Sequence, residues 1–83
     1  MMKYYTYILY SAILDTYYVG FTSMEIAERL TKHNTTHKGF TGRTKDWTCV
    51  YYEEFKTKAE AYARERDIKS KKSRRYIEGL VNS

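Results

Sequence analysis

The sequence predicts an α+β fold, in which a small three-stranded antiparallel sheet is flanked by three helices in the order β-β-α-β-α-α. Three segments are rich in tyrosine and β-branched residues, which is typical of strands. Three others carry helix-capping residues or the apolar spacing of an amphipathic helix. The chain has 83 residues, of which 42% are hydrophobic. This suffices for one small core, so we expect a single domain over residues 1–83.

The strands are expected at residues 4–13, 17–21 and 47–55. The first two are separated by Leu14-Asp15-Thr16, which is typical of a tight turn, so they should form a hairpin. Residues 35–46 are polar and contain two glycines, which indicates a loop before the third strand.

The helices are expected on either side of the third strand. Ser23 is a candidate N-cap for a helix over residues 24–34. Thr57 and Glu60 form a capping box, in which two side chains satisfy free amides at the start of a second helix that ends near Ser70. The apolar side of a short third helix consists of Tyr76, Ile77, Leu80 and Val81.

Two tyrosines of the hairpin are expected to converge beside a glycine. Side chains alternate between the faces of a strand, so an even hairpin loop places Tyr7 on one face with Tyr18 and Gly20. An odd loop or a bulge would break this parity. Many of the 10 tyrosines can simply be strand and core aromatics. Two hydroxyls beside Gly20, which leaves room for a ligand or a backbone, are a more specific pattern.

Glu25, Arg29 and His33 recur every fourth residue, so they line one stripe of the first helix. One interpretation is a surface ion pair between Glu25 and Arg29, with His33 as a bystander. In the other interpretation, Arg29 binds a phosphate group, whose oxygens its planar guanidinium fits. His33 would then carry a proton near neutral pH. The spacing alone does not decide between them.

Glu65 falls on the inward side of the second helix, together with Ala61, Tyr62 and Ile68. A carboxylate in that position is costly unless it is paired or bound to a metal. It can form a buried pair with an arginine or a tyrosine. It can also hold Mg²⁺, which often takes one or two carboxylates and fills its other positions with water. The sequence leaves these alternatives about even.

Positive charge is concentrated in the last third of the chain. The net charge is +5, and nine of the 15 lysines and arginines lie between Lys56 and Arg75. Such a cluster favours nucleic acid or another acidic surface over a merely solvated face, without separating DNA from RNA. The candidate phosphate contacts are Lys71, Lys72, Arg74 and Arg75.

Several classes of protein are excluded by what the sequence lacks. Its one cysteine, Cys49, leaves no cysteine-rich zinc site and no disulfide framework. No apolar run approaches the roughly 18 residues of a membrane span, and the start lacks the apolar segment of a secretion signal. We therefore expect a cytoplasmic protein with no membrane partner.

These motifs together resemble those of the GIY-YIG nuclease superfamily, above all its small single-domain bacterial group. Tyr5-Thr6-Tyr7 is similar to the first motif, whose Gly and Ile are replaced here, and Tyr18-Val19-Gly20 is similar to the second. Arg29 and His33 match the Arg and His of the family's helix, and Glu65 matches its metal-binding glutamate. The resemblance covers nearly the whole chain.

The resemblance implies a divalent-metal-dependent endonuclease that hydrolyses phosphodiester bonds in DNA. Glu65 and water would hold a single Mg²⁺, and Arg29 would bind the scissile phosphate. Tyr7 or Tyr18 would take a proton from the attacking water, and His33 would relay it.

The resemblance also bears on how substrate is held. Lys38, Thr41 and Arg43, in the glycine-containing loop, would contact nucleic acid, as would the strand near Gly20. Larger members of the family attach a separate DNA-binding domain. Here target choice is expected to come from the catalytic domain itself or from a protein partner. Two other functions on the same fold stay open: a non-catalytic nucleic-acid-binding module and a protein-interaction adaptor.

Overall fold

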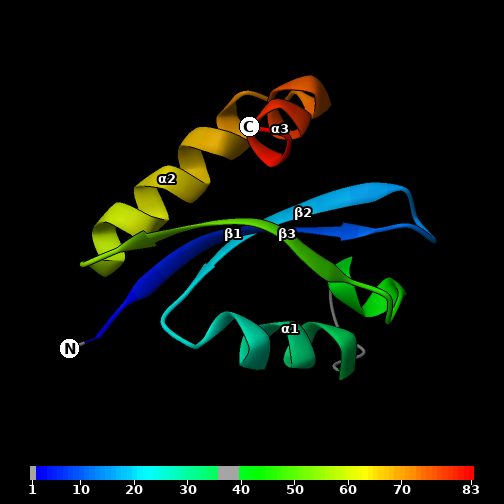
Figure 1. Ribbon diagram of the computed structural model, residues 1–83, viewed down its shortest axis with the longest axis horizontal. Coiled ribbons are helices and arrows are strands. Elements are labelled where there is room, and N and C mark those ends of the chain that lie inside the picture. Colours follow the sequence, from blue (N-terminus) through cyan, green and yellow to red (C-terminus); the bar gives the residue numbers. More distant parts are fainter. Residues whose placement is uncertain (1, 36–39) are drawn as a thin grey trace.

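A three-stranded antiparallel sheet of order β2-β1-β3 lies at the centre of the computed structural model, which describes residues 2–35 and 40–83. The elements are β1 (Tyr4–Ser11), β2 (Thr16–Thr22), α1 (Ile26–Thr35), the 3₁₀ helix η1 (Phe40–Arg43), β3 (Thr48–Phe55), α2 (Lys58–Ser70) and α3 (Arg74–Val81). Helix α1 covers one face of the sheet, and α2 and α3 lie over the other (Figure 1). The α+β class and the order β-β-α-β-α-α are confirmed.

The β1–β2 hairpin has the even loop on which the parity of the tyrosines depends. Ser11 pairs with Thr16, so the turn occupies residues 12–15 and β1 ends earlier than expected. Asp15 has a φ of 49°, in the left-handed region that aspartate tolerates in turns. Its carboxylate accepts a hydrogen bond from the Tyr10 hydroxyl at 2.7 Å, which holds the turn against the strand.

Tyr7 pairs with Gly20 across the hairpin, so both lie on one face of the sheet with Tyr18. The parity prediction is confirmed. Because alternate residues share a face, Leu9 joins Tyr7 in a core that also contains Trp47. Residues of α1 pack against this core, so α1 and the tyrosine pair share one side of the molecule.

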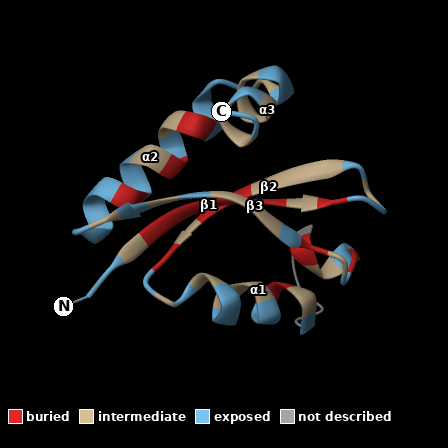
Figure 2. Ribbon diagram, viewed as in Figure 1, coloured by how far each residue is buried: buried red, intermediate tan, exposed pale blue. Residues whose placement is uncertain are grey.

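The opposite face of the sheet carries a second core, formed by Ile8, Val19 and Ile68. The residues of β1 in these two cores make its centre the most buried part of the sheet (Figure 2). The apolar side predicted for the third helix packs here as expected, through Tyr76, Ile77, Leu80 and Val81.

Helix α1 begins later than the sequence suggested, and Ser23 is not its N-cap. The Met24 amide donates to the hydroxyl of Thr22 at 3.0 Å, which turns the chain before the helix starts. The amide of Arg29 then donates to the carbonyl of Glu25 at 3.0 Å. Glu25 therefore stands at the cap position, and Ser23 is exposed.

Helix α2 buries Ala61, Glu65 and Ile68 as predicted, but Tyr62 is 47% exposed, so its assignment to the inward face was wrong. Each residue turns the helix by about 100°, which carries position 62 to the border of the buried side. There its ring meets Phe21 edge-on, with centroids 5.3 Å apart.

Side-chain caps begin both C-terminal helices. The hydroxyl of Thr57 accepts from the amide of Glu60 at 3.2 Å, which confirms that half of the predicted capping box. The Glu60 carboxylate accepts from the same hydroxyl at 3.1 Å instead of reaching a backbone amide. Ser73 caps α3 in the same way, through the amide of Tyr76 at 3.1 Å.

Within the described parts of the chain, no helix combines the length and the apolar character that a bilayer crossing needs.

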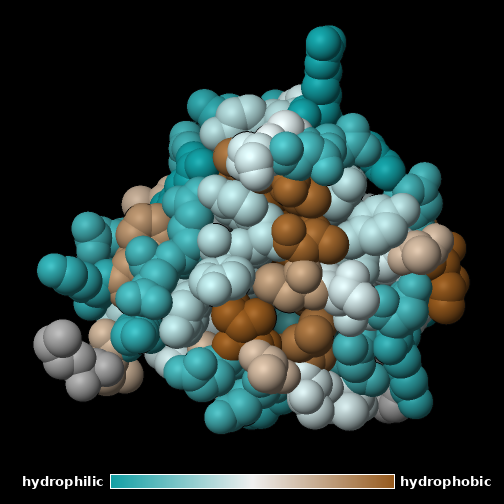
Figure 3. Space-filling model, viewed as in Figure 1, coloured by the Kyte–Doolittle hydropathy of each residue, from teal (hydrophilic) through white to brown (hydrophobic). Residues whose placement is uncertain are grey.

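Strands β2 and β3 are the two edges of the sheet. On the face shown in Figure 3, hydrophobic residues form a band that runs from α3 across β3 towards α1. A groove whose lining includes Ile26, Cys49, Val50, Leu80 and Val81 joins the same three elements. Tyr7 of the central strand and Tyr18 of the other edge strand, β2, lie on the α1 side of the sheet, and the candidate site is built there.

Candidate active site

The hydroxyl of Tyr7, a residue that is only 1% exposed, joins β1 to α1. Nε of Arg29 donates to the phenol oxygen at 3.3 Å, and Nε2 of His33 lies 2.8 Å from it. Arg29 and His33 can reach the same phenol because residues four apart share one side of a helix. The alternative ion pair is not found among the described residues: Glu25 is exposed, and Arg29 turns to Tyr7.

His33 lies between two hydroxyl groups and is 5% exposed. Its Nδ1 is 2.9 Å from Oγ1 of Thr41. The Tyr7 oxygen already accepts from Arg29, and its own buried proton needs an acceptor. Nε2 of His33 is the acceptor that the geometry offers. This network assigns the imidazole proton to Nδ1, which donates it to Thr41.

Thr41 and Trp47 hold the imidazole of His33 in place through a chain of hydrogen bonds. The indole Nε1 of Trp47 donates to the carbonyl of Thr41 at 2.9 Å. The side chain of Asn34 bonds both backbone groups of Trp47, at 2.9 and 3.0 Å. The end of α1 is thereby fixed to the start of β3. Asn34 and Trp47 were not predicted, because no local pattern links them, and Thr41 was expected to meet substrate.

Burial governs the proton affinities of this cluster. Desolvation, and secondly the charge of Arg29, lowers the pKa of His33 from 6.5 to about 4. Desolvation raises the pKa of Tyr7, and the hydrogen bond and charge of Arg29 oppose this rise. At neutral pH the imidazole is therefore uncharged and the phenol keeps its proton. An uncharged imidazole facing a protonated phenol can accept its proton.

Gly20 is required by the position of Tyr7. A Cβ atom at residue 20 would lie 2.6 Å from the phenol oxygen of Tyr7 and 2.8 Å from its Cζ. It would also lie 3.1 Å from Cε2 of Tyr18. The ring of Tyr7 therefore fills the space that a side chain at residue 20 would occupy. Tyr18 is half-buried beside it, with its ring 5.2 Å from that of His33.

Glu65 approaches the tyrosines from α2 and is 8% exposed. Among the described residues, its ion-pair partner is a lysine: Nζ of Lys69 lies 3.3 Å from Oε2. The same ammonium lies over the ring of Tyr18, 5.7 Å from its centroid. The charge of Glu65 also adds to the raised pKa of Tyr7, whose main cause is burial. Lys69 therefore links the carboxylate to the tyrosine pair. Its spacing of four residues from Glu65 was the signal that could have revealed it.

Among residues 2–35 and 40–83, no three His, Cys, Asp or Glu side chains are grouped so that they could hold a metal ion. A site built wholly from protein ligands is therefore not found in this part of the chain. One buried carboxylate beside a cation remains, and that arrangement suits an ion that keeps most of its water, as Mg²⁺ does.

Four residues of the basic cluster form ion pairs with other described residues: Arg64, Lys69, Lys71 and Arg74. Lys71 lies 3.5 Å from Asp67. The Arg74 guanidinium donates to Asp15 at 2.7 Å and to Glu78 at 3.1 Å. The pair between Arg74 and Asp15 fastens the start of α3 to the hairpin turn.

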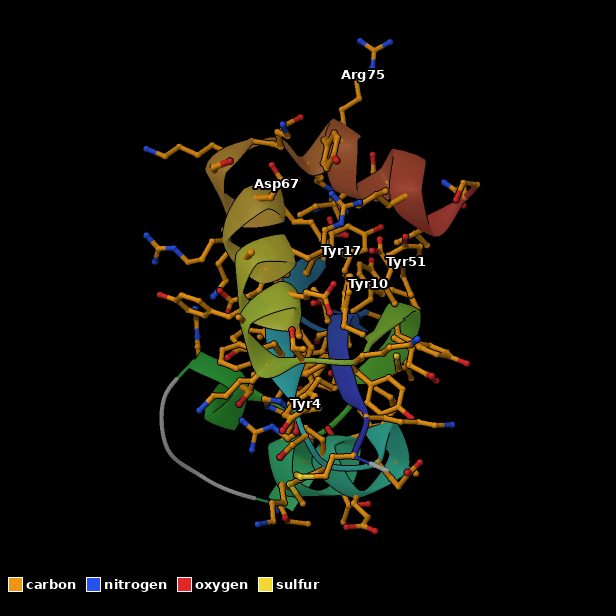
Figure 4. The ribbon with its side chains drawn as sticks, turned by 90° about the vertical axis from the view of Figure 1, so that its left-hand side faces the viewer. Tyr4, Tyr10, Tyr17, Tyr51, Asp67 and Arg75 are labelled. Carbon is orange, nitrogen blue, oxygen red and sulfur yellow. The ribbon has the colours of Figure 1, made fainter. Side chains whose placement is uncertain are left out.

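The other candidate substrate contacts are dispersed. Arg75 is exposed and projects from α3 away from the sheet (Figure 4). Arg43 is exposed at the end of η1, and Lys72 is exposed between α2 and α3. Lys38 falls outside the described residues.

Comparison with known proteins bears on this arrangement. The model of the GIY-YIG catalytic domain matches residues 3–77. The solution NMR structure of the UPF0213 protein BH0048 from Bacillus halodurans is 30% identical, with a TM-score of 0.58. The alignment covers 98% of this chain and 84% of that one. No curated protein matches the chain. Because the domain model spans nearly all of the elements that build the site, the chain belongs to the GIY-YIG family.

Proposed function

We propose that this chain is an endonuclease that hydrolyses phosphodiester bonds in DNA with Mg²⁺ or another divalent cation. The observation that carries the proposal is the phenol of Tyr7, which an arginine and an uncharged histidine contact at 3.3 and 2.8 Å. A guanidinium that can bind phosphate, a proton path and a buried carboxylate therefore lie near one hydroxyl.

Arg29 binds the scissile phosphate in this proposal. Its Nε is engaged by Tyr7, and no other described residue accepts a hydrogen bond from this guanidinium. The terminal N–H groups are thus available for a forked contact with phosphate oxygens. The same charge offsets the negative charge that grows on those oxygens during attack.

Tyr7 carries the proton. Its oxygen takes a proton from the attacking water while its own proton passes to Nε2 of His33, 2.8 Å away. The new imidazolium keeps its Nδ1 proton on Thr41. No free tyrosinate is needed in this scheme, which matters because burial raises the pKa of Tyr7. Tyr18 and Gly20 hold the phenol in place.

Glu65 is the residue that would hold the divalent cation, together with water. When bound, such an ion polarises the phosphate and neutralises the leaving oxygen. The side chain fits this role because it is 8% exposed and already has a cation, the Lys69 ammonium, at 3.3 Å. Lys69 is exposed, so its flexible side chain can move from the carboxylate.

The basic residues on α2, α3 and their connection bring nucleic acid to this site. Phosphate contacts of this kind release counterions, so affinity should fall with a log–log slope of roughly −0.9 per phosphate on duplex DNA. Lys71, Lys72 and Arg75 can be changed to serine together, leaving Arg74 to hold the hairpin turn. We expect this triple variant to show a flatter salt slope. An unchanged slope would place the DNA elsewhere.

The test of the function is incubation with single-stranded, duplex and branched DNA, each with Mg²⁺ and with chelator. The proposal predicts cleavage of at least one DNA that requires the cation and is lost in Tyr7→Phe. Salt-sensitive binding without cleavage by the wild type would favour a non-catalytic binding module. Absence of both would favour a protein-interaction adaptor.

A further inference from the structure

A pocket of about 420 Å³ adjoins the candidate site, between the edge of β2 and the connection from α2 to α3. This volume falls within the roughly 300–1,000 Å³ of small-ligand sites. Tyr17 and Tyr18 line it from the strand, and Val19, Ile68 and Ile77 provide apolar surface. Aromatic and apolar walls of this kind suit a flat ring.

The charged residues of the pocket are all cations: Lys69, Lys72 and Arg74. Lys69 also contacts Glu65, and Tyr18 lines the pocket, so the pocket borders the proposed site of cleavage. The guanidinium of Arg74 lies over the ring of Tyr17, 5.2 Å from its centroid. A guanidinium plane is a surface on which nucleobases stack. Lys69 and Arg74 already pair with carboxylates outside this lining, which leaves Lys72 as the cation that can meet a phosphate.

Lys72 has an unusual backbone for its residue type. It follows the C-cap of α2, Lys71, and has a φ of 47°. Glycine is the usual residue at this position after a helix, because the left-handed region strains other side chains. A lysine therefore stands at the pocket in a position where glycine would make the folded protein more stable. No described residue forms an ion pair with Lys72, in contrast to Lys69 and Arg74.

We propose that the pocket takes one unstacked nucleobase of the bound strand, while Lys72 meets the phosphate next to it. The proposal rests on the function given above, and it names the substrate class: DNA with an unpaired nucleotide beside the cut. Extruding a base from an intact duplex costs a few kcal/mol, and an unpaired base avoids most of this cost. A fully paired duplex should therefore be the poorer substrate.

The first experiment separates base from phosphate recognition. A fluorescein-labelled duplex with a single-stranded arm is titrated with wild-type protein in chelator, and fluorescence anisotropy gives the Kd. Each arm nucleotide near the junction is replaced in turn by an abasic spacer, which keeps the phosphates. Stacking of about 1–3 kcal/mol per base predicts a loss of roughly 5-fold or more at one position. A change below about 2-fold at every position would overturn the proposal.

The second experiment uses Lys72→Gly and, as a charge-matched control, Lys3→Gly. Lys3 lies before β1 and does not line the pocket. We expect Lys72→Gly to unfold at a higher urea concentration than the wild type, because its backbone strain is relieved. It should nevertheless bind the armed DNA several-fold more weakly than Lys3→Gly does. Equal affinity of the two variants would contradict the role of Lys72.

The two proposals can fail separately. Binding is measured in chelator and cleavage with Mg²⁺. Weaker binding of an abasic DNA without cleavage supports the pocket proposal and contradicts the proposed catalysis. Cleavage without such weaker binding contradicts the pocket proposal and supports the proposed catalysis. If no DNA is bound, both are wrong.

Discussion

The phenol of Tyr7 lies 2.8 Å from Nε2 of His33, although 26 positions separate the two residues in the sequence. Both side chains are buried, and burial keeps the imidazole uncharged and the phenol protonated. The contact therefore combines a proton donor and an acceptor whose states suit a transfer at neutral pH.

Gly20→Ala should damage this contact. The new methyl group would stand 2.6 Å from the Tyr7 oxygen and 2.8 Å from Cζ, so the ring must shift. We expect a loss of about 1–3 kcal/mol in the free energy of unfolding, as overpacked cores show. Urea denaturation measures it.

Gly79→Ala is the matched control. Gly79 lies in α3, and a Cβ there meets nothing within 4 Å. Alanine should therefore stabilise the helix by about 0.5–1 kcal/mol. The two variants should shift stability in opposite directions. A neutral or stabilising Gly20→Ala would mean that Tyr7 does not lie across this residue.

His33 should make stability depend on pH in a defined window. Its pKa is 6.5 when unfolded and about 4 when folded, so between these values the unfolded chain binds more protons. Stability should consequently fall as pH drops from about 6.5 to 4, by about 3 kcal/mol at most. His33→Gln should lack this component. Urea denaturation of both proteins at pH 7 and 4.5 gives the difference, and equal pH dependence would contradict the buried, uncharged imidazole.

Local periodicity was enough to predict which side chains share a face. The two-residue period of strands brought Tyr7, Tyr18 and Gly20 together, and the helical period buried Glu65. Both periods follow from backbone geometry, although the tyrosine convergence also required the even hairpin loop that the structure shows. This is why the order of elements and much of the candidate site could be read in advance.

The remaining features depend on contacts between distant segments or between competing neighbours. Thr41 lies behind His33 because η1 packs near α1, and no sequence spacing reports that. Ser23 is not the cap because the hydroxyl of Thr22 turns the chain at Met24 and the helix begins only after Glu25. Lys69 pairs with Glu65 although an arginine or a tyrosine was equally compatible with the sequence.

Glu65→Gln should keep the fold and abolish cation-dependent cleavage. The amide is nearly isosteric but lacks the charge that a hard cation needs. Titration with Mg²⁺ should perturb amide resonances near residue 65 in the wild type and not in the variant. The metal assignment falls if both proteins respond alike.

The proton path from Tyr7 to His33 is tested most directly by single-turnover cleavage of one DNA substrate with Mg²⁺ across pH 4–9. The wild type should stay active well below pH 6.5, because the pKa of His33 is about 4. Tyr7→Phe should lose about 10²–10⁴-fold in rate, the usual contribution of a positioned proton-transfer group. Tyr18→Phe should lose far less. A Tyr7→Phe variant that cleaves at the wild-type rate, or a larger loss in Tyr18→Phe, would contradict the account.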